Sequence, residues 1–108
     1  MRSLSISIVV FVSFCVTPSL VRAEDSSSAR ELFMRGVELF RGDEYDDALD
    51  AFQRSYALNP VVSVLYNIAM CQRALFRYVE SIETFEQYLA LGEDSISAER
   101  RTECLALI

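Results

Sequence analysis

The sequence predicts an all-α fold built from antiparallel helix hairpins. The main observation is an internal repeat: at a shift of 33 residues Tyr45 matches Tyr78 and Phe52 matches Phe85. The second observation is that helix-capping residues and turn formers separate segments whose length suits helices. A unit of this size holds two helices and a turn. The chain of 108 residues therefore has room for one small domain of two such units.

Residues 1–23 have the three zones of a secretory signal peptide: a basic start, an apolar run and a polar tail. The tail ends with Val21 and Ala23, small residues at the spacing that signal peptidase accepts. We therefore expect cleavage after Ala23 and a periplasmic or secreted protein. An uncleaved membrane anchor is the alternative, because the apolar run approaches the roughly 17 to 25 residues that span a bilayer. Residues 24–28 then form a short polar linker.

The first hairpin is expected over residues 29–60. Its first helix starts at a capping box formed by Ser28 and Glu31 and ends at Gly42. Asp43 caps its second helix, and the acids that follow Asp43 lie in the first helical turn, where negative charge is favourable.

The second hairpin is expected over residues 62–91. Asn59 serves as the N-cap of its first helix and Pro60 as the first helical residue, a position where proline is well tolerated. Its second helix is expected over about 78–89, and a turn follows.

A fifth helix is expected over 97–108, starting near Ser97 and still running at Ile108. It is either a partial third repeat or a capping helix. Leu105 and Leu107 give it an apolar end, which predicts a further partner for this surface. We consider two partners: a later part of a longer exported protein that carries the specific function, or a second copy of the chain.

Small residues at matched positions explain how each hairpin closes. Gly36 and its repeat equivalent Ala69 let the second helix of each unit approach the first closely. Ala48 and Ser81 meet them from the facing helix. One such unit alone leaves apolar surface exposed, so neighbouring units must stack.

The segments VELFRGDEYDDALDAFQRSYALNP and YNIAMCQRALFRYVESIETFEQYLAL resemble the tetratricopeptide repeat (TPR) family. The second segment particularly resembles exported TPR proteins of Gram-negative bacteria. The resemblance implies a TPR-like α-solenoid with two repeats plus a partial or capping helix. It also implies a scaffold that binds another protein or peptide.

In this family ligands lie in a concave groove lined by the first helix of each repeat. Some members hold a C-terminal carboxylate there with Lys and Asn side chains. This chain matches that pattern only at Asn67, which argues against such a clamp. The simpler role of Asn67 is a structural hydrogen bond. By position, the groove residues are Arg30, Phe33, Val37, Phe40 and Arg41 from the first repeat and Ser63, Tyr66, Met70, Arg73 and Ala74 from the second.

The composition removes most enzyme chemistry. The sequence has no His, and all ten of its basic residues are Arg. It therefore lacks a Ser-His-Asp or Cys-His relay, an imidazole metal ligand and a Schiff-base lysine. The acidic run GDEYDDALD lacks the spacing of a calcium loop and fits a turn and helix start. We expect a non-enzyme with no catalytic residues, no cofactor and no metal site.

Charge indicates the class of partner. Acids outnumber basic residues by sixteen to ten, a formal net charge of −6 that repels nucleic acid and anionic lipid. We therefore expect no nucleic acid partner, and membrane contact only through an uncleaved leader. Arginines concentrate on the first helices of the repeats and acids on the second helices. An acidic peptide is the ligand that this segregation favours, although acids at helix N-termini also have a purely structural explanation.

Two cysteines remain after the leader is removed, Cys71 and Cys104. In TPR stacking their helices are neighbours, and an oxidising compartment would permit a disulfide between them. The alternative is that both are small buried apolar residues whose Cβ atoms point apart.

Overall fold

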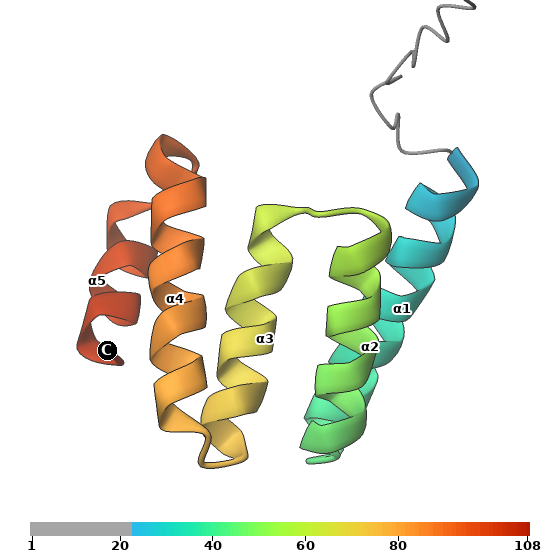
Figure 1. Cartoon of the computed structure of the whole chain (residues 1–108), viewed down its shortest axis with the longest axis horizontal. Coiled ribbons are helices and arrows are strands. Elements are labelled where there is room, and N and C mark those ends of the chain that lie inside the picture. The colour runs from blue at the N-terminus through green and yellow to red at the C-terminus, as the bar shows by residue number, and fades with distance from the viewer. Residues whose placement is uncertain (1–22) are drawn as a thin grey trace, which may run out of the picture.

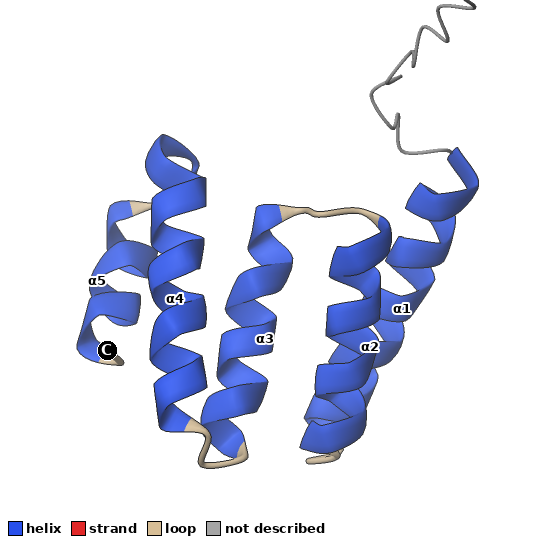
Figure 2. Ribbon diagram, viewed as in Figure 1, coloured by secondary structure: helices blue, strands red, loops and turns tan. Residues whose placement is uncertain are grey.

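The structure is a computed structural model that describes residues 23–108; the leader predicted over 1–23 lies, except for Ala23, outside the described residues. The described part is all-α, as the sequence predicts, and contains no strand (Figures 1 and 2). Its elements are α1 (Ala23–Arg41), α2 (Tyr45–Leu58), α3 (Val62–Ala74), α4 (Tyr78–Gly92), the short 3-10 helix η1 (Glu93–Ser95) and α5 (Ala98–Ala106).

The helices lie side by side in chain order (Figure 1). α1 packs on α2 and α3 packs on α4, which gives two antiparallel hairpins, and α2 joins them through its contact with α3. α5 lies against α4 at the end of the row. This arrangement confirms helix-hairpin packing.

The aromatic residues of the repeat form the centre of each hairpin. Phe52 is 1% exposed and Phe85 is fully buried. Gly36 leaves room for the Phe52 ring, because a Cβ atom at Gly36 would lie 2.7 Å from its Cε1 atom. In the second hairpin the Ser81 hydroxyl donates a hydrogen bond to the Ala69 carbonyl oxygen at 3.0 Å, which holds α4 close to α3.

The two hairpin turns have the same backbone. The Glu44 N–H donates to the Leu39 carbonyl oxygen at 2.9 Å, and 33 residues later the Arg77 N–H donates to the Gln72 carbonyl oxygen at 2.9 Å. Both bonds belong to Schellman motifs that terminate α1 and α3. The left-handed residue is Asp43 in the first turn (φ 60°) and its repeat equivalent Phe76 in the second turn (φ 62°).

Asp43 therefore does not cap α2, which corrects the sequence prediction. Its backbone closes the end of α1 instead, and its carboxylate accepts a hydrogen bond from the Tyr45 hydroxyl at 2.8 Å. Residue Glu44 occupies the N-cap position of α2 without a side-chain hydrogen bond.

The starts of α1 and α3 also differ from the prediction. α1 begins at Ala23, so residues 24–28 are its first turns and not a linker, and Ser28 lies within the helix. α3 begins at Val62 with an extended Val61 as its N-cap, so Pro60 precedes the helix and is not its first residue. Asn59 does not cap α3, because its side-chain amide is directed to the Ser26 hydroxyl at 3.5 Å.

The start of α5 is as predicted. The Ser97 hydroxyl caps it by accepting a hydrogen bond from the Arg100 N–H at 3.2 Å. The helix ends at Ala106, where the Leu107 N–H bonds the Cys104 carbonyl, and so it does not continue to Ile108 as expected. Within residues 23–108 no helix has both the length and the apolar character needed to cross a membrane.

Candidate functional site

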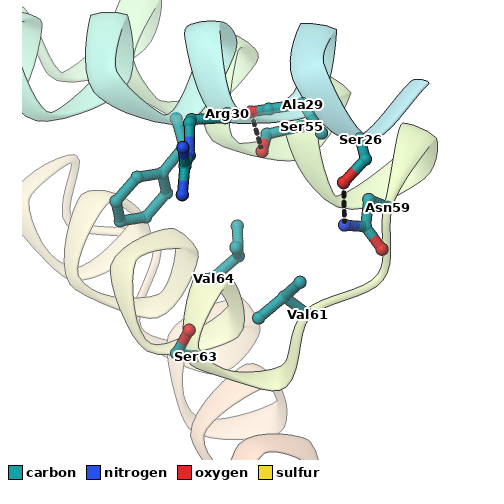
Figure 3. Close-up of a pocket in the computed structure, with 9 residues that line it drawn as sticks. Ser26, Ala29, Arg30, Ser55, Asn59, Val61, Ser63 and Val64 are labelled. Carbon is teal, nitrogen blue, oxygen red and sulfur yellow. Dashed lines mark hydrogen bonds between the residues drawn. The ribbon is translucent and has the colours of Figure 1, made fainter. Parts of the chain in front are cut away.

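A cavity of about 270 Å³ opens between α1 and α3, next to the C-terminal end of α2. It lies on the face formed by the first helices of the two hairpins, where the sequence predicts a groove. Arg30 extends from α1 into this space, while Val61, Ser63 and Val64 form the opposite wall (Figure 3). The lining is Ser26, Ala29, Arg30, Phe33, Ser55, Asn59, Val61, Ser63 and Val64.

Arg30 is the single charged side chain of this lining. It is solvent-exposed and forms no ion pair with any residue of the described chain. A guanidinium presents a planar set of N–H donors that suits a carboxylate. The cavity therefore offers a cationic group without an internal partner.

The polar groups that line the cavity are of two kinds: some are hydrogen-bonded within the chain, and others have no protein partner. The Ser55 hydroxyl is buried and already hydrogen-bonded, since it donates to the Ala29 carbonyl oxygen at 2.7 Å. This bond connects α2 to α1. Asn59 holds Ser26 through its amide nitrogen, which leaves its amide oxygen without a protein donor in the described residues (Figure 3). Ser63 is exposed at the start of α3. The lining of the cavity thus also contains hydrogen-bonding groups that have no partner within the described residues.

The cavity brings together only three of the predicted groove residues: Arg30, Phe33 and Ser63. Phe33 packs against Phe52 with ring centroids 5.5 Å apart, so its ring is anchored to the core. The other predicted residues of the groove continue along α1 and α3 outside this cavity. They are Val37, Phe40, Met70, Arg73 and Ala74, all half-buried, and the exposed Arg41.

Tyr66, also predicted for the groove, is partly covered by α5. Its hydroxyl donates to a Glu103 carboxylate oxygen at 3.0 Å, and the Arg100 guanidinium lies 4.1 Å from its ring centroid. Burial, followed by the hydrogen bond to Glu103, raises the pKa of Tyr66. This tyrosine therefore fixes α5 in place and is less available to a ligand.

Two further residues of α3 make contacts within the chain, and for Asn67 this is the structural role that the sequence favours. Asn67 donates to the Ser63 carbonyl oxygen at 3.3 Å within α3. Arg73 lies over the Tyr78 ring, 5.7 Å from its centroid. Neither residue lines the cavity.

Cys71 and Cys104 are both free and fully buried, which agrees with the alternative of two small buried apolar residues and not with a disulfide between them. They are 33 residues apart in the sequence and lie on α3 and α5, at equivalent positions of the repeat. Burial raises the pKa of the Cys71 thiol to about 12 and also raises the pKa of Cys104. Since the thiolate is the reactive form, neither thiol is a nucleophile at neutral pH.

The sequence interpretation missed most of the cavity. The sequence predicts Ser26 in a linker and Asn59 as a helix cap. It places Ser55 on the second helix of its hairpin, whereas the groove is expected on the first. Val61 and Val64 had no signal beyond their apolar character. Only the packing of α1 and α3 against α2 places these side chains around one cavity.

The chain is similar to the "Tetratricopeptide repeat protein 36 homolog" of Drosophila melanogaster, with 34% identity over 79 residues. The aligned region is 73% of this chain and 41% of the relative, so the chain matches about two fifths of that protein's length. No family model matches the sequence, and no solved structure matches it. This partial similarity, together with the hairpin packing and the 33-residue structural repeat, supports a TPR-like family.

Proposed function

We propose that the chain is a non-enzymatic scaffold that binds a polypeptide segment along the face of α1 and α3. The observation that supports this most is the cavity around Arg30, which joins one unpaired cation to hydrogen-bonding groups and an apolar wall. Peptide sites in proteins combine the same features: apolar contact area and a few polar groups that fix orientation.

The ligand that fits this cavity is a carboxylate carried by an otherwise apolar segment. Arg30 would bind the carboxylate through two parallel N–H donors. Ser63 and the amide oxygen of Asn59 would bind main-chain groups beside it, and Phe33 and Val64 would contact apolar side chains. The Lys and Asn clamp of other TPR proteins is absent at Phe33 and Val37, so Arg30 is the anchor of this proposal.

Site-specific crosslinking tests this function. A photoreactive residue placed at Ser63 should capture a defined polypeptide in the source cell, and one at the exposed Gln87 of α4 should not capture it. Arg30→Glu should abolish that capture. Arg35→Glu is the matched control, because Arg35 makes the same charge change on α1 without lining the cavity. Equal loss in both variants would indicate a general charge effect and contradict the proposed anchor.

Export is the second part of the proposal and follows from the three zones of residues 1–23. The mature protein would then act in the periplasm or outside the cell. Intact-mass measurement of the protein from the source cell should give an N-terminus at Glu24. An N-terminus at Met1 would contradict cleavage.

Self-assembly through α5 is a second candidate function. Leu105 is 60% exposed and Ile108 is 42% exposed, although both belong to the apolar end of the chain. If this surface pairs with another copy, Leu105→Asp with Ile108→Asp should convert a concentration-dependent dimer into a monomer in sedimentation velocity.

A further inference from the structure

The two hairpin turns have one backbone geometry and opposite surface chemistry. At the three equivalent pairs of positions the first turn has Asp43, Glu44 and Asp46, and the second turn has Phe76, Arg77 and Val79. All six residues are exposed.

The fold does not require the apolar residues of the second turn. The first turn closes with the same main-chain hydrogen bonds while it carries acids. Phe76 adopts the left-handed conformation that bulky residues rarely adopt, yet its side chain is 77% exposed. Its ring packs edge-on against the Tyr78 ring, with centroids 6.2 Å apart. A strained aromatic residue that contributes little to the core is a candidate contact residue.

These residues form a continuous patch, which we call the aromatic turn: Phe76, Tyr78 and Val79 with Arg73 and Arg77 beside them. Val79 is 71% exposed and Tyr78 is 48% exposed. The Arg73 guanidinium lies 5.7 Å from the Tyr78 ring centroid. The patch is therefore apolar at its centre and cationic at its margin.

The acidic turn, formed by Asp43, Glu44, Asp46 and Asp47, lies at the same end of the molecule (Figure 1). Arg77 reaches from the aromatic turn to Asp46 at 3.9 Å, so the two turns are adjacent. Phe40 and Tyr45 pack edge-on beside the acids, with ring centroids 5.2 Å apart. One end of the chain thus carries two neighbouring surfaces of opposite charge, each with an aromatic pair.

We propose that a second copy of the chain covers the aromatic turn, in a two-fold arrangement that places the aromatic turn of each copy on the acidic turn of the other. A two-fold interface requires a surface that is complementary to itself. Two adjacent turns of opposite charge meet this requirement, because a two-fold rotation can bring the arginines of each copy to the acids of the other. A lipid surface fits less well, since the acidic turn would be brought against anionic headgroups.

Sedimentation velocity of the complete protein over a concentration series tests this interface. The wild-type protein should form a dimer that weakens as salt rises, because the complementary charges are screened. Phe76→Asp with Val79→Asp gives the second turn the residues that the first turn already carries, so this variant should fold normally. It should weaken the dimer by more than about tenfold, with a melting temperature no lower than that of the wild type when both proteins are dilute enough to be monomeric.

Two control variants separate this interface from others. Leu91→Asp alters an apolar residue that is 54% exposed and lies outside both turns, and it should leave the dimer intact. A wild-type protein that stays monomeric at every concentration would overturn the proposal. So would a dimer that Leu105→Asp with Ile108→Asp dissociates and Phe76→Asp with Val79→Asp does not. Binding of a monomeric wild-type protein to phosphatidylcholine vesicles, lost in the Phe76 variant, would assign the patch to lipid and also overturn it.

Discussion

Phe76 holds a left-handed backbone that costs an ordinary L-residue about 1 to 2 kcal/mol. Its exposed ring recovers little of this cost through packing within the chain. Asn tolerates the left-handed conformation better. We therefore expect Phe76→Asn to raise the free energy of unfolding of the dilute protein by about 1 kcal/mol.

Urea denaturation followed by circular dichroism measures this change. Leu91→Asn is the matched control, since it replaces another exposed apolar residue by Asn within a helix. It should lower stability by a few tenths of a kcal/mol through helix propensity alone. A similar loss in both variants would mean that the Phe76 ring stabilises the monomer.

The buried thiol of Cys71 makes stability depend on pH in the alkaline range. An unfolded cysteine loses its proton near pH 9, whereas burial raises the pKa of Cys71 in the folded protein to about 12. Between these values the unfolded state binds fewer protons, so the free energy of unfolding falls as pH rises. Below this window the thiol is neutral in both states and contributes no pH dependence.

Urea denaturation at a series of pH values from about 8 to 11 tests this slope. Cys71→Ala should show a shallower fall than the wild type, because the tyrosines titrate in both proteins and cancel in the comparison. Parallel slopes would show that Cys71 does not remain protonated in the folded state.

At the scale of elements, the contact of α1 with α2 depends on the missing side chain at Gly36. Ala would add about 1 kcal/mol of helix propensity. Its Cβ atom, however, would lie 2.7 Å from the Phe52 ring, which is buried and cannot move aside freely. Overpacking of this kind typically costs about 1 to 3 kcal/mol, so we expect Gly36→Ala to be destabilising by about 1 kcal/mol.

Gly42→Ala is the control for this prediction. Its Cβ atom would meet no atom closer than the Leu39 carbonyl oxygen at 3.6 Å, an ordinary contact, and its φ is not positive. Thermal melting should therefore show almost no change for Gly42→Ala. If both alanine variants melt at the wild-type temperature, Gly36 does not limit the helix approach.

The helices were predictable from the sequence wherever a single local signal indicated one structure. The 33-residue repeat gave the two hairpins, and Ser97 gave the start of α5. The starts of α1 and α3 were not predictable, because Ser28 and Asn59 are good caps whose actual roles are decided by neighbouring segments. The residues with a left-handed backbone could not be predicted either. Gly42 is the obvious candidate in the sequence, yet Asp43 adopts this conformation and closes the turn.

At the scale of the whole molecule, burial is unevenly distributed along the row of helices. α3 has six buried residues, five of which belong to the hydrophobic core, whereas α5 has one, Cys104. Local unfolding is easiest where few apolar contacts must be broken. We expect the α5 amides to exchange with solvent about tenfold faster than those of α3. Ser97→Ala should increase the exchange rate of the α5 amides further, because it removes the N-cap of this helix.

Hydrogen–deuterium exchange followed by mass spectrometry of peptides from each helix measures this gradient. Ser63→Ala is a suitable control, because Ser63 is exposed on α3 and does not cap a helix. Equal protection of α3 and α5 would show that the side-chain contacts of Tyr66 with Arg100 and Glu103 hold α5 as firmly as a packed core.

The groove was predictable only in outline at this scale. Family resemblance predicts a groove along α1 and α3, and three of its predicted residues, Arg30, Phe33 and Ser63, line a cavity between these helices. The remaining wall depends on how far apart α1 and α3 lie, which no local pattern encodes. The covering of Tyr66 by α5 likewise depends on the order of packed helices.

The matched turns bear on how a duplicated unit diverges. Main-chain hydrogen bonds close both turns, so the side chains at Asp43 and Phe76 lie outside the set of residues that keep each hairpin together. Substitution at these positions leaves the core contacts of both hairpins unchanged. The turns are therefore where the two halves of a tandem duplication can acquire different surfaces while their interiors stay alike.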